Sequence, residues 1–347
     1  MRVCRRPFNY IYFDHFNGKV WLCPWMTTEG IIGNIFESDL LSLWHGDKAT
    51  AIRAKIASGD FSVCRPEACP LVQNDSIPNI SDEELPQITT VTDSPEYINL
   101  AYDFLCNQTC ETCRKQKFRP LPDYRKKVTE IGRKVLPYIN KAGRISMSGH
   151  GDPFASPYMM QLLMGIEPQA ANPIIEIETN GVYFDKKHWK KISHLSGRIG
   201  VFNVTVNSFD PFTYSHISKG GNYKKLMENL AFAAQLHDEG HIGAFLIGMV
   251  YQDRNFREIP TFIRRAREEF RCDRVILKPV YQWGTMAEDV FWFKDVLNPM
   301  HPYHAEWLEI MADPILREDY VYDFGGGTAH PARPFPGHSK TASGERS

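Results

Sequence analysis

Six short apolar runs alternate with segments of helical periodicity between residues 97 and 278, and this alternation limits the fold more than any other feature of the sequence. The runs have the length and the β-branched and aromatic content of buried strands, whereas the segments between them repeat apolar residues at helical spacing. Because parallel strands need crossover helices, the pattern predicts an α/β fold of parallel βα units, in a barrel or an open sheet. The expected strands are 97–102, 144–148, 174–178, 200–206, 243–250 and 274–278, and the expected helices are 123–136, 157–164, 187–195, 223–236 and 256–270.

The composition is that of an ordinary globular protein. Forty lysines and arginines stand against 41 aspartates and glutamates, so the net charge is −1 and we do not expect nucleic acid as a partner. The longest nearly apolar run, 242–251, is far shorter than the roughly 20 residues that span a membrane, and the N-terminus lacks the apolar stretch of a signal peptide. We therefore expect a cytoplasmic protein without a membrane segment.

Seven of the eight cysteines lie in the first third of the chain. We expect no disulfide framework, because a long chain without a secretion signal meets a reducing cytosol. The tightest group is Cys106, Cys110 and Cys113, whose three thiolates would leave one coordination position open. On the residues alone, this group suits either zinc with an open position or a [4Fe-4S] cluster with one iron not bound by protein.

Polar or glycine-rich segments follow the next three expected strands. They are 149–153 (GHGDP), 179–181 (TNG) and 207–208 (NS). In a βα barrel, the loops after the strands converge on one face, where the cysteine loop would also lie. Glycine lets a ligand approach the backbone, and Asn, Ser, Thr and carboxylate groups hydrogen-bond a polar organic ligand.

With these motifs in order on successive strands, residues 95–282 resemble the radical S-adenosylmethionine (radical SAM) superfamily. The C-x3-C-x2-C loop is the signature of that family, GHGDP resembles its Gly-Gly-Glu-Pro motif, and 179–181 and 207–208 match its ribose-side and carboxylate-side positions. The resemblance implies a partial (β/α)6 TIM-like barrel, a [4Fe-4S] cluster on the three cysteines, and S-adenosylmethionine on the open iron. It also implies cofactor contacts from Thr112, Gly149, His150, Gly151, Asp152, Glu178, Thr179, Asn180, Asn207, Ser208 and Lys219.

Three of these positions depart from the family pattern. Thr112 stands where the family usually has an aromatic or large apolar residue near the adenine, so we expect adenine packing from elsewhere. Asp152 is one methylene shorter than the usual Glu, so its contact with the methionine amino group is expected to run through a backbone carbonyl or a water. Lys219 lies near the place of an arginine that holds the methionyl carboxylate, and a lysine keeps the charge but loses the bidentate fork.

A second group of cysteines precedes the barrel and comprises Cys4, Cys23, Cys64 and Cys69. Residues 18–23 have the Gly-x4-Cys pattern of the auxiliary-cluster modules called SPASM or twitch, and residues 33–44 with the two later cysteines also resemble such a module. The usual place of the module is after the barrel, whereas here it comes first. Four cysteines match one fully ligated auxiliary [4Fe-4S] cluster, and a structural zinc site is the alternative.

The predicted organisation is an N-terminal auxiliary-cluster module, a linker, the partial barrel, a C-terminal helical extension and a mobile tail, at residues 1–70, 71–94, 95–282, 283–324 and 325–347. The eighth cysteine, Cys272, lies between an expected helix and the next strand. That position is at the end of the barrel away from the catalytic loops, so we expect a buried structural thiol.

The resemblance implies a radical enzyme that cleaves S-adenosylmethionine to methionine and a 5′-deoxyadenosyl radical, with an electron from a donor such as flavodoxin or ferredoxin. We predict hydrogen abstraction from an unactivated C–H of a small hydroxylated substrate of the sugar or aminocyclitol type, in an oxidation or epimerisation, with the auxiliary cluster as an electron relay. The alternatives are a maturase of a ribosomally made peptide and a non-enzymatic zinc- or cluster-binding regulator. The cysteine module occupies the first 70 residues, where a separate leader-binding domain is not apparent, and this favours the small substrate.

Overall fold

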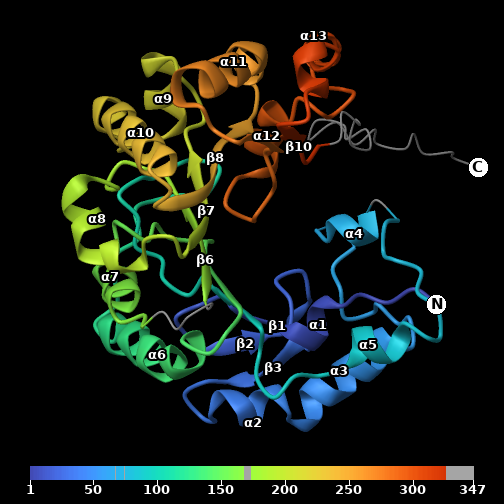
Figure 1. Cartoon of the computed structure of the whole chain (residues 1–347). Coiled ribbons are helices and arrows are strands. Elements are labelled where there is room, and N and C mark those ends of the chain that lie inside the picture. The colour runs from blue at the N-terminus through green and yellow to red at the C-terminus, as the bar shows by residue number, and fades with distance from the viewer. Residues whose placement is uncertain (67, 74, 168–172, 326–347) are drawn as a thin grey trace, which may run out of the picture.

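The computed structural model describes residues 1–66, 68–73, 75–167 and 173–325, and Figure 1 shows a curved sheet with helices along its outer side. The α/β prediction is confirmed, because the six expected strands are present, parallel and separated by helices. These strands are β4 (Tyr97–Leu100), β5 (Arg144–Met147), β6 (Ile174–Thr179), β7 (Ile199–Thr205), β8 (Ile242–Tyr251) and β9 (Arg274–Pro279). The helices between them are α6 (Tyr124–Ile139), α7 (Pro157–Met164), α8 (Lys186–Ile192), α9 (Pro211–Ile217), α10 (Tyr223–Asp238) and α11 (Ile259–Phe270).

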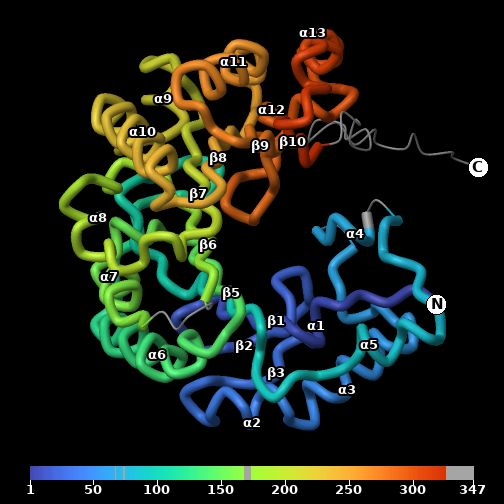
Figure 2. The backbone as a smooth tube through the Cα atoms, in the orientation of Figure 1, coloured from blue at the N-terminus to red at the C-terminus, as the bar shows by residue number. Residues whose placement is uncertain are grey.

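In the described part of the chain, one sheet of ten strands runs in the order β10-β9-β8-β7-β6-β5-β4-β1-β2-β3. The barrel strands follow one another in sequence order, and each pairs in parallel with the next, as Ile145 pairs with Ile175 and Ile247 pairs with Val275. The two edges of the sheet do not pair with each other, so the barrel is partial and open, as the tube in Figure 2 also shows.

Side chains alternate between the two faces of the barrel strands. The outer positions are apolar and fully buried, as at Ile98, Ile177, Phe202, Phe245 and Val275. The alternate positions face the inside of the arc and are largely polar, as at Asn99, Ser146, Glu178, Asn203 and Lys278. A closed barrel fills its interior with branched apolar residues. This open barrel instead has a polar inner wall, and its core lies between the sheet and the helices.

The N-terminal module extends the same sheet. Strand β1 (Tyr10–Phe13) pairs in parallel with β4, and β2 (Lys19–Trp21) and β3 (Ile31–Asn34) continue it in antiparallel pairs. One cluster of buried apolar side chains reaches from Val3 in the module to Trp307 near the C-terminus. The module and the barrel therefore share one core. The module helices are α1 (Arg6–Asn9), α2 (Leu40–Trp44), α3 (Asp47–Ala57), α4 (Pro70–Gln73) and α5 (Leu85–Thr89), the last two at and beyond its expected end.

The segment 71–94, expected as a linker, packs against the module. The carbonyl of Thr92 accepts a hydrogen bond of 2.8 Å from the indole of Trp44, which is fully buried. Leu85 and Ile88 of α5 lie partly buried against the core. This stretch therefore covers apolar surface of the module on its way to β4.

The C-terminal extension contains helices α12 (Glu288–Lys294) and α13 (His304–Met311), but it ends in a strand, β10 (Val321–Asp323). Strand β10 pairs in parallel with β9, so the extension adds a strand to the sheet after its two helices. Three extended residues are enough to form this strand, because the edge of β9 offers backbone N–H and C=O groups that would otherwise lack partners. Residues 326–347, most of the expected tail, lie outside the described residues. None of the described helices has the length and apolar content needed to cross a bilayer.

We expect Ile11→Ala to destabilise the barrel together with the module, because Ile11 on β1 is fully buried in the shared core. Removing a buried isoleucine side chain costs about 2–5 kcal/mol of unfolding free energy. Urea unfolding followed by tryptophan fluorescence and by far-UV circular dichroism should give two curves that shift together. The matched control Ile174→Ala, at a position that is 38% exposed, should cost under about 1 kcal/mol. Separate shifts of the two signals would show that the module and the barrel unfold independently.

Candidate active site

The cysteines of the C-x3-C-x2-C motif lie on the loop that follows β4, which we call the cysteine loop (residues 103–114). Burial raises the pKa of Cys106 to about 11, and the charge of Asp152 contributes. Burial also raises the pKa of Cys110 to about 12, and Cys113 and Cys106 add to the rise. The three thiols therefore act on one another electrostatically, and Cys113 is the solvent-exposed member of the group.

A buried carboxylate fixes the start of the cysteine loop. Asp103 accepts hydrogen bonds from the backbone N–H of Leu105 at 2.9 Å and from the hydroxyls of Tyr124 and Ser156. Burial raises the pKa of Asp103, and the two hydroxyl donors oppose that rise. Asp103 belongs to none of the sequence motifs, so it was not predicted as a site residue. Its position just past a buried strand was the one feature of the sequence that could have indicated it.

Asp152, from the loop after β5, ties that loop to the one after β6. One carboxylate oxygen accepts hydrogen bonds of 3.0 Å from the backbone N–H groups of Phe154 and Ala155. The other accepts from the hydroxyl of Thr179 at 2.7 Å and from the backbone N–H of Asn180 at 2.8 Å. Burial raises the pKa of Asp152, and the Asn180 and Thr179 donors oppose it. Both carboxylate oxygens are thus engaged within the protein, so Asp152 acts as a positioning residue.

Asn180 is the residue of the third loop that touches the cysteine loop. Its side-chain amide donates to Oδ1 of Asn107 at 2.9 Å and lies 3.6 Å from the sulfur of Cys106. The Nδ2 atom of Asn107 is buried and has no hydrogen-bond partner among the described residues. A buried amide donor normally finds a partner, so the position suits a polar ligand beside the cysteine loop.

Positions 149 and 151 accept only glycine, because a side chain at either would collide with its neighbours. Gly149 has φ of +104°, and a Cβ there would lie 2.5 Å from the Cβ of Ala101. A Cβ on Gly151 would lie 2.4 Å from the carbonyl oxygen of Asp103 and 2.7 Å from that of Leu105. The backbone of the loop after β5 therefore packs directly on the start of the cysteine loop.

His150 connects the barrel to the N-terminal module. Its Nε2 lies 2.9 Å from a carboxylate oxygen of Asp14, just past β1, and its ring stacks on Phe104 at 4.4 Å between centroids. Burial would raise the pKa of Asp14, but the hydrogen bonds and charge of His150 and the hydroxyl of Tyr12 lower it overall. The carbonyl of His150 accepts a hydrogen bond from Arg114 in the cysteine loop. His150 is thus held between the module and the cysteine loop.

Asn207 and Ser208, at the end of β7, are buried and bonded within the protein. Asn207 has φ of +66°, accepts from the backbone N–H of Val250 at 2.9 Å, and donates to Ser218 at 3.3 Å. The hydroxyl of Ser208 donates to Glu258 at 2.6 Å. Because Ser208 is fully buried and directed towards Glu258, we leave it out of the ligand set proposed below.

Lys219 binds the cysteine loop itself. Its ammonium pairs with Glu111, which lies between the second and third cysteines, and Lys294 of α12 approaches the other carboxylate oxygen at 3.2 Å. The hydrogen bond from Lys219, with help from Lys294, lowers the pKa of Glu111. Lys294 is almost fully buried and donates to Gln252 at 3.1 Å. Lys294 lies beyond the family motifs, so the sequence did not single it out.

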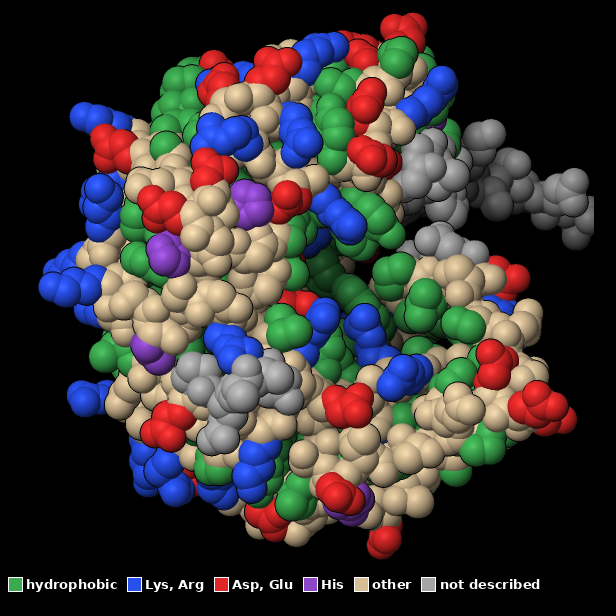
Figure 3. All heavy atoms as spheres, in the orientation of Figure 1, with side chains coloured by type: hydrophobic (Ala, Val, Ile, Leu, Met, Phe, Trp, Pro, Cys, Tyr) green, Lys and Arg blue, Asp and Glu red, His purple; other side chains and the backbone are tan. Residues whose placement is uncertain are grey.

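The loop after β9 spans from the cysteine loop to the N-terminal module. The hydroxyl of Thr285 donates to the carbonyl of Thr112 at 3.3 Å. The indole of Trp283 stacks on that of Trp25, at 6.2 Å between centroids and 19° between planes. This contact joins the last barrel loop to the module, and Figure 3 shows the molecule hollowed between these two parts.

The inner wall of the barrel carries a charged pair. Glu178 on β6 lies 3.3 Å from the ammonium of Lys278 on β9, and their side chains are 43% and 35% exposed. Asn203 on β7 donates to Glu178 at 3.4 Å. The Oδ1 atom of Asn203 is buried and has no hydrogen-bond partner within the described residues. The expected cofactor residue Glu178 therefore belongs to a polar group on the wall.

The four N-terminal cysteines also act on one another. Burial raises the pKa of Cys23 and of Cys64 to about 12 each, and Cys4 and Cys69 add to both rises. Burial would lower the pKa of Arg6, but Cys23, Tyr10, Cys4 and Tyr97 together raise it overall, so a cation stands beside this group. Across the described ranges, no three His, Cys, Asp or Glu side chains are grouped closely enough to hold a single metal ion. Both cysteine groups are thus spaced more widely than the ligands of one ion.

Cys272 is fully buried, as predicted for a structural thiol. It lies between α11 and the start of β9, and burial raises its pKa to about 12. Its carbonyl accepts a hydrogen bond of 2.6 Å from Arg267, which closes the turn between helix and strand. The cysteine loop follows the opposite, carboxyl ends of the strands.

Residues 104–266 match the radical SAM superfamily, and residues 4–70 match the SPASM iron–sulfur cluster-binding domain. Among solved structures, the chain is similar to the crystal structure of Streptococcus suis SuiB bound to S-adenosylmethionine, with 13% sequence identity and a TM-score of 0.44. That match covers 85% of this chain and 63% of the other, so the chain spans less than two thirds of the length of that protein. No curated protein matches the sequence.

We expect Asp152→Ala to lower the free energy of unfolding by about 2–4 kcal/mol, because it leaves buried hydrogen-bond donors without an acceptor. Urea unfolding of the iron-free protein measures this loss, and iron content after reconstitution should fall as well. The control Asp152→Asn keeps one acceptor oxygen, so its unfolding free energy and its iron content should both fall less. Unchanged stability in Asp152→Ala would show that the loops keep their places without this carboxylate.

Proposed function

Because the chain belongs to the radical SAM superfamily and carries a SPASM domain at its N-terminus, we propose that it is a radical enzyme acting on a small hydroxylated molecule. Membership brings S-adenosylmethionine, a [4Fe-4S] cluster and an auxiliary iron–sulfur cluster, and it requires an electron donor and a substrate. When bound, these cofactors supply a 5′-deoxyadenosyl radical that abstracts a hydrogen atom from an unactivated C–H of the substrate. The remaining tasks of binding, orientation and exclusion of water fall to the protein.

Cys106, Cys110 and Cys113 are the proposed ligands of the radical-generating cluster. Their number leaves one iron free for S-adenosylmethionine. Burial keeps the pKa of the first two well above neutrality, so in the iron-free protein these thiols hold their protons, and binding of cationic iron would release them. The guanidinium of Arg114 lies 3.9 Å from the sulfur of Cys113 and adds positive charge beside the thiolates.

The polar contacts proposed for S-adenosylmethionine come from the loops around the cysteine loop. Asn107 offers an unpartnered amide donor, and Asn180 holds that side chain in place. The backbone at Gly151 packs directly against Asp103 and Leu105, just ahead of Cys106. Asp152 and Thr179 orient these loops through their mutual hydrogen bond of 2.7 Å. Lys219 is already paired with Glu111, so a carboxylate of the cofactor would have to share its ammonium.

The observation that carries the substrate proposal is the polar group on the inner wall. Lys278 donates, Glu178 accepts, and the Oδ1 atom of Asn203 is an acceptor without a partner in the described structure. Such a wall suits a molecule with several hydroxyl or amino groups, as a sugar or aminocyclitol has. An apolar substrate would desolvate these groups without replacing their hydrogen bonds, at a cost of about 1–3 kcal/mol for each.

The proposed auxiliary ligands are Cys4, Cys23, Cys64 and Cys69. Four thiolates complete the coordination of every iron in a [4Fe-4S] cluster, so the substrate has no place on it and an electron relay is the suitable role. The parallel pairing of β1 with β4 and the contact of Asp14 with His150 tie this module to the barrel. A relay suits oxidation or epimerisation, which remove or return an electron after hydrogen abstraction.

Anaerobically reconstituted protein, given dithionite and S-adenosylmethionine, should form 5′-deoxyadenosine, and Cys106→Ala, Cys110→Ala or Cys113→Ala should abolish that product. Iron content should be about eight per chain in the wild type and about four in each variant, since one of two clusters is lost. Cys272→Ala, at the buried structural thiol, is the matched control and should keep both the product and the iron. Product formation by the three variants would contradict the site, and its absence in the wild type would favour a non-enzymatic regulator.

Lys278→Met and Glu178→Gln should remove the stimulation of S-adenosylmethionine cleavage by substrate and leave the slow cleavage without substrate. The substrate-stimulated rate of cleavage should fall at least about tenfold, which is the effect of losing one hydrogen bond to a charged group. A panel of deuterated sugars and aminocyclitols serves as the probe, and transfer of deuterium into 5′-deoxyadenosine marks the carbon attacked. Lys186→Met on the exposed side of α8 is the control. Stimulation by peptides and not by this panel would point to the peptide maturase instead.

A further inference from the structure

A strongly basic surface lies directly beside the cysteine loop. Residues 113–134 contain nine lysines and arginines and two acidic residues, in a chain whose net charge is −1. The exposed cations of this stretch, which we call the basic patch, are Lys115, Lys117, Arg119, Arg125, Lys126 and Arg133. Within the described residues, none of the six forms an ion pair, whereas the neighbouring Lys127 is paired with Asp123. The patch is therefore free to meet the negative charge of a partner.

Aromatic packing fixes the patch against the cysteine loop. Phe118, between Lys117 and Arg119, packs on Phe104 at 5.6 Å and on Tyr124 at 4.9 Å between ring centroids. Phe104 lies two residues ahead of Cys106, and its backbone N–H donates to the hydroxyl of Tyr124 at 2.8 Å. The first cations of the patch follow Cys113, the exposed cysteine, by two and four residues.

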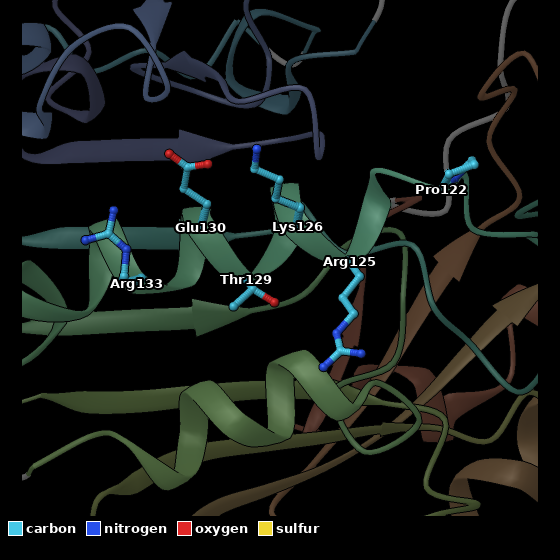
Figure 4. Close-up of a pocket in the computed structure, with 6 residues that line it drawn as sticks. All are labelled: Pro122, Arg125, Lys126, Thr129, Glu130 and Arg133. Atoms are coloured by element: carbon cyan, nitrogen blue, oxygen red, sulfur yellow. The ribbon is translucent and has the colours of Figure 1, made fainter.

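The patch continues along the first turns of α6. Figure 4 shows Arg125, Lys126 and Arg133 projecting from this helix, and together with Thr129 and Glu130 they line a shallow groove of about 560 Å³. Figure 3 shows lysine and arginine side chains gathered on the part of the surface where α6 lies. Helix α6 belongs to the outer layer, so the groove faces away from the polar inner wall.

We propose that the basic patch is the docking surface for an acidic one-electron carrier protein, an inference that rests on the function proposed above. The reduced carrier loses one electron and the oxidised cluster on the cysteine loop gains it, with no bond formed or broken. Opposite charges steer such encounters and fix their orientation, and their attraction weakens as salt rises. Docking here would place the carrier over the exposed Cys113 without covering the inner wall.

The test compares reduction by a protein with reduction by a small molecule. The reconstituted holoenzyme forms 5′-deoxyadenosine with reduced flavodoxin in one series and with dithionite in the other. The variant K117E/R125E/K126E should lose at least about tenfold of the flavodoxin-driven rate at low salt and keep the dithionite-driven rate within about twofold. The variant K187E/K190E/K191E on α8 makes the same change of charge on exposed lysines of another outer helix and should keep both rates.

Binding of flavodoxin to the holoenzyme, measured by fluorescence anisotropy, separates this inference from the proposed function. If the wild type cleaves no S-adenosylmethionine with dithionite, the proposed function fails. Even then, the docking surface would be supported if the patch variant lost flavodoxin binding and the α8 variant kept it. Equal flavodoxin-driven rates in the wild type and the patch variant would overturn the inference. An equal loss in the α8 variant would also overturn it, as would patch-dependent binding of a duplex nucleic acid with no effect on flavodoxin.

Discussion

The buried carboxylate of Asp152 is the interaction on which the geometry of the site depends. A carboxylate removed from water must find donors, and Asp152 has four of them, two in the loop after β5 and two at the end of β6 and just past it. Its own backbone N–H donates to the carbonyl of Leu105 at 2.8 Å, so the cysteine loop joins the same network. Three loops from separate strands thus keep fixed positions relative to one another. The cysteine loop is one of them, so the network also fixes the backbone that carries Cys106, Cys110 and Cys113.

The open barrel explains why the inner wall is polar. The helices cover the outer face of the sheet and its apolar positions, while the arc does not close tightly enough to bury Glu178 and Lys278 on the inner face. Glu178 and Lys278 would be costly inside a closed core, because buried charges need water or several partners. Here they pair with each other at 3.3 Å on the inner wall and remain partly exposed. The contact of Trp25 with Trp283 ties the loop after β9 to the module.

The sequence predicted the βα order and the two cysteine groups, because strand periodicity and short motifs are local signals. It did not indicate that Asp14 and Lys294 reach the site, or that Asp103 binds Tyr124 and Ser156, because those contacts depend on how distant segments pack. Ser208 was predicted from its motif position to contact the cofactor. Its hydroxyl instead donates a hydrogen bond to Glu258, the residue just before α11. The polar inner wall was readable in part, since Glu176 and Glu178 alternate with isoleucines in β6.

The distribution of charge separates two tasks that would otherwise conflict. Radical chemistry needs a site that excludes water and stray hydrogen donors, whereas delivery of an electron needs a surface that a carrier protein can reach. In this chain the polar wall faces the hollow, and the basic patch lies on the outer layer next to the exposed Cys113. Within the cysteine loop, Arg114 donates to the carbonyl of Phe104, and it also donates to the carbonyl of His150 in the loop after β5. A carrier docked on α6 would therefore leave the inner wall uncovered and available to the substrate.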